Sequence, residues 1–492
     1  MTGLLLRDVE LDGRIRADVR VVGNRITEVG AALVRRPGEQ EHACRGGALL
    51  PGLCDHHVHL HALAATGRSV NCGPPEVTDR DGLAEALAAA TPDEHGWIRG
   101  VGYIETVAGD LDAAALDRMH PHRPVRVQHR SGALWMLNTA AVAAAGIGSG
   151  DHPGVERDLS GTPTGRLWRA DNWLRARLPP AEPPDLAPVG AALAQHGITT
   201  VTDATPDLSA DTIAAIATAM RSGALPQRVH LLGAPLGGFP DDSQVRSRGE
   251  KVMNRGDRAH NPARSDGGSR LTVGPYKIVL ADSGLPSPDE LAGRIRAVHA
   301  TGRAIAAHCV SREALVILLA ALDEAGVLPG DRIEHAALVP AELIPVLAHH
   351  RIRVVSQPGF IAHRGDDYLR DLPPHDRADV YRCAGLTRAG IPLALSSDAP
   401  YGPLDPWAII AAAVQRRTPA GRVVGPGERL TAAHALDAYL APPDDPGGPA
   451  RRIGPGAVAD LVVLHVSLEQ ALAYPAPGLV RFTIINGKIA EW

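Results

Sequence analysis

The sequence predicts an α/β protein: a (β/α)8 TIM-type barrel, a small β-sandwich formed by both chain termini, and an insertion after the first barrel strand. Three observations support this prediction. Short apolar segments bounded by turn residues recur along the chain, segments with helical spacing separate them, and both ends alternate apolar with polar residues. The 492 residues exceed the ~250 typical of one barrel, so additional modules are expected.

Eight apolar segments are predicted as the barrel strands. They are residues 49–60, 198–204, 228–233, 276–280, 304–308, 332–336, 353–357 and 392–398. Strands that alternate with helices along a chain are typical of parallel α/β folds, and eight such repeats match one closed barrel.

Two of the connecting helices carry clear end signals. Ser287 precedes a helical pattern as N-cap, and Glu290 completes a capping box with it. Gly302 ends that helix. A second helix is expected to begin after Ser311 and to end at Gly326.

The domain boundaries follow from these elements. Residues 1–48 and 453–492 alternate as strands of a half-buried antiparallel sheet do, and are predicted to form the β-sandwich together. The barrel spans 49–452 and contains an inserted subdomain at about 66–185, a region rich in Gly, Pro and Asp turns. Residues 240–270 are polar and charged, which predicts either a mobile active-site flap or a disordered segment.

Composition and charge exclude several classes of protein. The net charge of -5 comes from 50 basic and 55 acidic residues spread along the chain, which gives no basic surface for a nucleic acid. No apolar run approaches the ~18 residues of a membrane span. The start lacks the pattern of an export signal, and the five cysteines are irregularly spaced. We therefore expect a cytoplasmic protein, and assembly into a homo-oligomer stays open.

A His-x-His pair ends the first predicted strand. His57 and His59 lie two residues apart, so the strand period of two places both side chains on one face. At the mouth of a barrel these imidazoles could share a metal. Asp55, on the same face one layer deeper, is predicted to support a histidine. The pair alone is more often two ordinary histidines, and the chain contains 22.

Four further polar side chains lie in or at the ends of later predicted strands. His308 ends the fifth strand, His335 lies near the end of the sixth, Asp398 ends the eighth, and Lys277 lies within the fourth. Catalytic groups of barrel enzymes collect at the carboxyl ends of the strands. The combined pattern therefore predicts a metal site there.

Two motifs resemble those of the amidohydrolase superfamily. The segment PGLCDHHVHL is similar to its PGxxDxHxHL signature, and ALSSDAPYGPLDPW resembles the GSDAP...DP segment of its family-3 branch, which includes N-substituted formamide deformylases. The segments GWIRGVGY, GTPTGRL, RIEHA and IGPGAVADLVVL follow in the order of the family.

The resemblance implies a set of site residues. The metal ligands would be His57, His59, Lys277, His308, His335 and Asp398, with Lys277 carbamylated as a bridging ligand and Asp398 also moving protons. The cofactor implied is a divalent metal, zinc in the first place, with one or two ions per chain. Mn, Fe and Co would also suit these ligands.

The chain departs from the branch at two places. The branch has a histidine in an Asp-Gly-His-Ser segment where this chain has Ser131, Gly132, Ala133 and Leu134. Asp282 lies one place later after Lys277 than in the common form. Both departures concern the substrate, and Tyr103 is a further candidate for contacting it.

The predicted function is hydrolysis of a non-peptide carbon–nitrogen bond in a small molecule, such as an amide, formamide or cyclic amide. One alternative is a mononuclear deaminase of a ring substrate, in which Lys277 would be an unmodified lysine of the barrel. The other alternative is a metal-free scaffold protein.

Overall fold

A computed structural model describes residues 3–149, 152–180, 182–237, 269–282 and 284–491. The chain forms two compact units, one of Met1–Leu60 with Asp185–Trp492 and one of His61–Pro184. No helix in the described ranges is long and apolar enough to cross a membrane. Residues 240–268 of the predicted flap lie outside the described residues.

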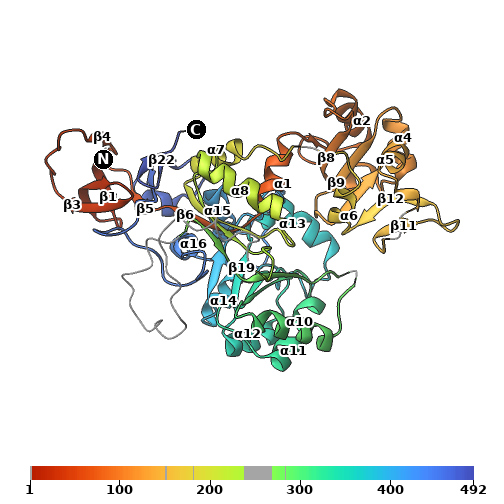
Figure 1. Cartoon of the computed structure of the whole chain (residues 1–492). Coiled ribbons are helices and arrows are strands. Elements are labelled where there is room, and N and C mark those ends of the chain that lie inside the picture. Colours follow the sequence, from red (N-terminus) through yellow and green to blue (C-terminus); the bar gives the residue numbers. More distant parts are fainter. Residues whose placement is uncertain (1–2, 150–151, 181, 238–268, 283, 492) are drawn as a thin grey trace. The chain divides into compact units, whose positions relative to one another are not determined.

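Parallel strands form the centre of the first unit (Figure 1). They are β6 (Leu53–Val58), β13 (Ile198–Asp203), β14 (Arg228–Leu231), β15 (Leu271–Val273), β16 (Tyr276–Val279), β17 (Ile305–Cys309), β18 (Arg332–His335), β19 (Arg353–Ser356) and β20 (Leu393–Leu395). They pair in the orders β15-β14-β13-β6 and β16-β17-β18-β19-β20. Eight of these nine strands correspond to the eight predicted ones.

The strand pairing is not one closed ladder, which differs from the predicted barrel. The short strand β15 pairs with β14 and takes the edge that a closed barrel would offer to β16. Backbone hydrogen bonds still cross both gaps between the sheets. The N–H of Lys277 donates to the carbonyl of Leu232 (3.1 Å), and the N–H of Asp398 donates to the carbonyl of His57 (2.9 Å).

The predicted strand 49–60 is two strands. Residues Leu49–Pro51 form β5 and pair with a C-terminal strand, and only β6 joins the parallel sheet. The switch falls at Gly52, whose N–H donates to the carbonyl of Asp460 (2.8 Å). A Cβ atom on Gly52 would lie 2.2 Å from the side chain of Thr199, so the close passage requires glycine.

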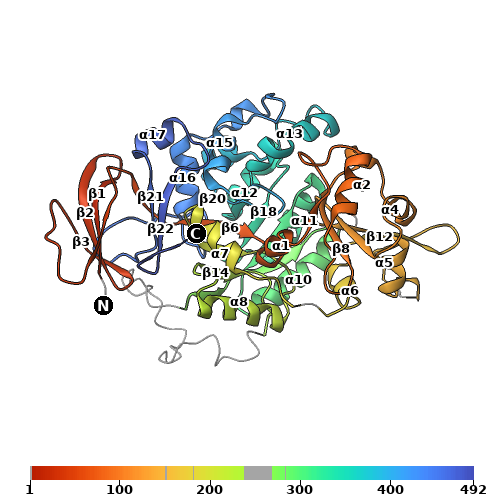
Figure 2. The same cartoon turned by 90° about the horizontal axis from the view of Figure 1, so that it is seen from above.

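Helices surround the parallel strands in both views (Figure 2). They are α7 (Ala187–Gln195), α8 (Ala210–Ser222), α10 (Pro288–Ala300), α11 (Arg312–Ala325), α12 (Ile344–His350), α13 (Gly359–Asp371), α14 (Cys383–Arg388), α15 (Pro406–Gln415) and α16 (Ala432–Leu440). The end signals at Ser287, Ser311 and Gly326 are confirmed: Ser287 forms the capping box with Glu290, and Ser311 caps α11, which ends at Gly326.

The chain ends form two further sheets of the first unit. One has the order β3-β2-β1-β4 and the other β23-β22-β21-β5. Their strands are β1 (Gly3–Leu11), β2 (Ile15–Val22), β3 (Arg25–Gly30), β4 (Gln40–Ala43), β21 (Leu461–Leu464), β22 (Val480–Ile485) and β23 (Lys488–Ile489), with α17 (Leu468–Ala473) between β21 and β22. Apolar side chains of both ends, including Leu6, Val19, Leu461 and Ile484, share one core.

The second unit, the insertion, has a sheet of its own. Its strand order is β11-β12-β10-β9-β8-β7. The strands are β7 (Val70–Asn71), β8 (Ile98–Tyr103), β9 (Val125–His129), β10 (Leu134–Leu137), β11 (Val155–Arg157) and β12 (Pro163–Trp168). The helices are α2 (Arg80–Ala89), α3 (Glu105–Ala108), α4 (Ala113–Met119), α5 (Thr139–Ala144) and α6 (Asp171–Arg175), and α1 (Leu60–Thr66) begins where the first unit ends.

Tyr103, considered above as a substrate contact, ends β8 inside the core of this insertion. Its ring is 1 % exposed and packs with apolar side chains such as Leu116 and Val127. Its hydroxyl donates to the carbonyl of Gly109. The structure thus gives this tyrosine a packing role.

Candidate metal centre

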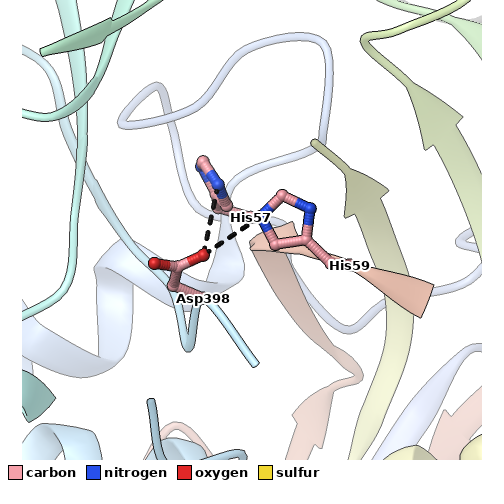
Figure 3. A group of neighbouring side chains, drawn as sticks. All are labelled: His57, His59 and Asp398. Atoms are coloured by element: carbon pink, nitrogen blue, oxygen red, sulfur yellow. Dashed lines mark ion pairs between the residues drawn. The ribbon is translucent and has the colours of Figure 1, made fainter. Parts of the chain in front are cut away.

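Strand β6 and the loop after β20 hold the centre of the site together. Besides the bond from Asp398 to His57, the N–H of His59 donates to the carbonyl of Ala399 (2.9 Å). Two backbone bonds thus fix the His-x-His pair against the carboxylate. Asp398 Oδ1 lies 3.4 Å from His57 Nε2 and 3.2 Å from His59 Nε2 (Figure 3). The other ring nitrogen of His59 lies 3.1 Å from Thr205 Oγ1.

These three side chains can offer ligand atoms to one ion. One such atom each from His57, His59 and Asp398 lie within 4.8 Å of one another. His57 Nε2 and Asp398 Oδ1 are buried and have no hydrogen-bond partner among the described residues. Because buried polar atoms are nearly always satisfied, this pair of unsatisfied atoms fits a metal ion as the missing partner.

Asp398 was predicted to end the eighth strand, but in the structure it lies outside any strand. Strand β20 ends at Leu395, and Asp398 follows in a turn with φ of 55°. Aspartate tolerates this left-handed region better than most residues because its short polar side chain bonds locally. The turn brings the carboxylate over the end of β6.

Two more histidines continue the group. The ring of His335 lies 4.7 Å from that of His57, and the ring of His308 lies 4.5 Å from that of His335. His335 has φ of 74°, which breaks the strand alternation at the end of β18. Its Nδ1 lies 2.9 Å from Gln357 Oε1 and 3.9 Å from Asp398 Oδ2.

The sequence analysis missed Glu334, which supports His57 from behind. Glu334 Oε2 pairs with His57 Nδ1, and Glu334 Oε1 accepts a hydrogen bond from Arg332 Nε at 2.5 Å. The side chains of all three residues are 0 % exposed. A carboxylate that accepts the Nδ1 proton fixes the tautomer whose Nε2 lone pair faces the site. The sequence did contain a signal for Glu334. Arg332 and Glu334 are two charged residues in one short buried strand, and buried charges need partners.

Asp55 has a different role from the predicted support of an imidazole. Its Oδ1 accepts from the backbone N–H groups of His57 (3.1 Å) and Ser397 (3.1 Å). It thereby ties β6 to the loop that carries Asp398. Burial raises the pKa of Asp55 to about 6, although these hydrogen bonds favour the charged form.

Lys277 lies on β16 with its side chain inside the group of strands. The residue is 5 % exposed, and its Nζ has no hydrogen-bond partner in the described part of the chain. Burial lowers its pKa to about 8, against the opposing charges of Glu334 and Asp398. Asp282, which follows β16, accepts a hydrogen bond from Ser311 Oγ at 2.5 Å.

The electrostatics of the centre suit metal ligands. Burial lowers the pKa of His57 well below its usual value, and the charge of Lys277 adds to this. Burial also lowers the pKa of His335. Burial alone would raise the pKa of Asp398, but the surrounding imidazoles, His59 first among them, lower it overall. Neutral imidazoles and an ionised carboxylate are the protonation states that bind a metal.

A cluster of histidines and a carboxylate at the carboxyl ends of parallel strands is typical of metal-dependent hydrolases. Comparison with known proteins agrees with this class. The model of the family described as "Amidohydrolase family" matches residues 40–490, so the chain belongs to the amidohydrolase family. The membership supports an enzyme that acts on carbon–nitrogen bonds of a small-molecule substrate.

Individual relatives are distant but cover most of the chain. The N-substituted formamide deformylase of Arthrobacter pascens is 26% identical over an alignment 521 residues long. The alignment covers 93% of this chain and 92% of that protein. YtcJ of Bacillus subtilis (strain 168), described as an amidohydrolase, is 26% identical over 403 residues, which cover 78% and 76%.

Solved structures show the fold. An uncharacterized metal-dependent hydrolase from Pyrococcus horikoshii has a TM-score of 0.71 at 18% identity, with 100% of both chains covered. A second, from Pyrococcus furiosus, has a TM-score of 0.63 at 19% identity, with 89% of this chain and 93% of that one covered.

Proposed function

We propose that this enzyme uses a divalent metal to hydrolyse a non-peptide carbon–nitrogen bond, such as that of an amide, formamide or cyclic amide. The observation that carries the proposal is the group of His57, His59 and Asp398, in which the buried atoms His57 Nε2 and Asp398 Oδ1 have no hydrogen-bond partner among the described residues. The name of the Arthrobacter relative supports formamides as one substrate class.

The metal would be held by His57, His59, His308, His335 and Asp398, and zinc suits this combination of nitrogen and oxygen donors. When bound, such a metal lowers the pKa of a water molecule to about 7 and polarises a carbonyl oxygen. The protein has to keep the imidazoles neutral and oriented, which burial and the contacts of His57 with Glu334 and His335 with Gln357 do.

Asp398 is the group that moves protons. Its carboxylate lies between the imidazoles of His57 and His59, where it can accept a proton from the attacking water. It then returns that proton to the departing nitrogen, because an amide nitrogen is too basic to leave as an anion. Water is consumed, the C–N bond breaks, and a carboxylic acid and an amine are formed.

We also propose that Lys277 carries a carbamate that bridges two metals. The amine nitrogen would add to carbon dioxide and lose a proton, which gives an oxygen ligand of charge -1. A buried Nζ without a hydrogen-bond partner supports this modification. An unmodified ammonium would be repelled by two divalent ions.

The test of the carbamate is Lys277→Ala with added short carboxylic acids. We expect two metals per wild-type chain, loss of activity in the variant, and partial rescue by the acid. One metal per chain and an active Lys277→Ala variant without rescue would favour a mononuclear enzyme, such as a ring deaminase.

We propose in addition that the parallel strands close into a barrel, that the chain ends form a β-sandwich, and that the protein is cytoplasmic. The backbone hydrogen bonds of Lys277, Asp398 and His59 across the two gaps support a barrel that closes. The shared apolar core of the chain ends supports a terminal β-sandwich. The five cysteines are free and buried, which fits a reducing cytoplasm.

The direct test of the function is a hydrolysis screen with metal-replete protein over N-formyl, N-acyl and cyclic amides. We expect release of an amine from at least one of these classes and no release after metal removal. Turnover that is unaffected by metal removal would contradict the proposal.

A further inference from the structure

An aromatic cluster lies beside the metal centre. The chain contains only 3 phenylalanines and 7 tyrosines. Four of them belong to one cluster: Phe360 and Tyr368 lie on α13, Tyr381 lies between α13 and α14, and Tyr401 follows β20. The rings of Phe360 and Tyr381 lie 6.0 Å apart, as do those of Tyr368 and Tyr381. This concentration gives one apolar wall in a chain that is otherwise poor in aromatic residues.

The cluster is directly connected to the metal centre through Tyr401. The N–H of Tyr401 donates to the carbonyl of Asp398 (2.8 Å). The ring of Tyr401 meets the ring of His59 edge-on, with centroids 5.4 Å apart. Burial raises the pKa of the Tyr381 hydroxyl well above its usual value, and the charge of Asp398 adds a little to this. The wall is therefore close to the reacting groups.

Arg364 brings a positive charge into this cluster. Its guanidinium lies over the ring of Phe360 at 4.0 Å from the centroid, and its Nη2 donates to the carbonyl of Tyr401 (2.9 Å). Helix α13 is kinked at Arg364 itself, with φ of -141° and ψ of 21°. The kink takes this residue out of the helical pattern that its neighbours follow.

The guanidinium has no counter-charge in the described part of the chain. Its Nε is buried without a hydrogen-bond partner, and no carboxylate of the described residues forms an ion pair with it. Charged groups that are partly buried are normally paired, because removing a charge from water is costly. An arginine with donors in a planar fork is suited to a carboxylate. A ligand could therefore supply the missing partner.

We propose that Arg364 and the aromatic cluster form a subsite for the carboxylate and the apolar group of the substrate. The inference rests on the proposed hydrolase function and narrows its substrate class to amides that carry a carboxylate next to an apolar or aromatic side chain. The carboxylate would bind Arg364, whose guanidinium lies over the buried ring of Phe360, and the side chain would pack on the partly exposed ring of Tyr401. The amide would then lie towards His59 and Asp398.

A matched pair of substrates tests the subsite. N-formylphenylalanine and N-(2-phenylethyl)formamide differ only in the carboxylate, so the ratio of their kcat/KM values isolates its contribution. We expect the metal-loaded wild type to prefer the carboxylate compound by at least about 10-fold, and Arg364→Met to reduce that preference by about 10- to 100-fold, as expected for a hydrogen bond between charged groups. Arg364→Lys should restore part of the preference.

Arg370 gives a control on the same helix, since it is exposed and pairs with Asp367 and Asp371. Arg370→Met should keep the wild-type ratio. An equal loss for both compounds in Arg364→Met would mean that Arg364 only holds the loop of Tyr401, and equal turnover of both compounds by the wild type would also overturn the subsite while the hydrolase function stands.

If neither compound is hydrolysed, measurements of binding affinity test the subsite separately from the hydrolase function. Calorimetry on metal-loaded wild type and Arg364→Met then measures the affinity for each compound directly. Tighter binding of N-formylphenylalanine that is lost in the variant supports the subsite even though the proposed chemistry fails for formamides. Equal affinities in both proteins would overturn the subsite.

Discussion

Replacement of Glu334 by glutamine should weaken metal binding although Glu334 is not a proposed ligand. Glutamine keeps the shape of the side chain but loses the charge that pairs with both Arg332 and His57. His57 would then lose the acceptor that fixes its Nδ1 proton, and its Nε2 would face the metal less often in the correct tautomer.

Two losses are expected in Glu334→Gln, one of metal affinity and one of stability. Changes to a carboxylate behind a metal-bound histidine typically lower metal affinity by about 10- to 100-fold, which is about 1.4–2.7 kcal/mol. Stability falls as well, because Arg332 and Glu334 are both 0 % exposed and removal of one partner of a buried pair costs about 3–5 kcal/mol. Since glutamine still accepts one hydrogen bond, we expect a loss near 3 kcal/mol.

Two assays on the same protein separate these effects. Competition with a chromogenic chelator gives the metal Kd, and urea unfolding of metal-free protein gives the stability. Glu428→Gln is the matched control, because Glu428 is buried and its contacts lie away from the histidines. It accepts from the N–H of Gly385 (2.6 Å) and pairs with Arg382 and Arg388. The control should lose stability and keep the metal Kd. If Glu334→Gln also kept the wild-type Kd, the reasoning about His57 would be refuted.

Two further predictions concern single residues. Asp398→Asn should keep the fold, measured by circular dichroism, and lose about 10²- to 10⁴-fold in kcat as expected for removal of a general base; near-normal turnover with metal still bound would exclude the proton transfer assigned to Asp398. Tyr103→Phe should lower the unfolding free energy by about 1 kcal/mol, because the carbonyl of Gly109 loses its donor, while KM stays unchanged; a several-fold rise in KM would instead indicate a substrate contact.

The sequence predicted the elements whose signals are local. Apolar runs between turn residues located the parallel strands, and capping residues such as Ser287 and Ser311 located the starts of two helices. The spacing of His57 and His59 was also informative, since both side chains reach Asp398. In each case a few neighbouring residues determine the conformation.

Other features depend on contacts between distant segments. Residues 49–60 were predicted as one strand although they contain the turn pair Pro51-Gly52. The change of sheet at this pair is set by contacts of Gly52 with Thr199 and Asp460, which lie far away in the sequence. The position of Arg364 beside Tyr401 depends on a kink inside α13. Gly365 follows the kinked residue directly, but a single glycine in a helical pattern does not predict a kink. Strand β15 was missed because it is only three residues long. Such features need the folded structure.

The central claim is that a metal held by the strand-end histidines and Asp398 makes this chain a hydrolase. The most direct measurement is a titration of metal-stripped protein with zinc, manganese or cobalt, in which bound metal per chain and amide hydrolysis are followed together. The account predicts that activity is absent without metal and rises with occupancy to a plateau at one or two ions per chain. Protein from metal-rich growth that contains no transition metal, and gains no activity on addition of any of these ions, would contradict it.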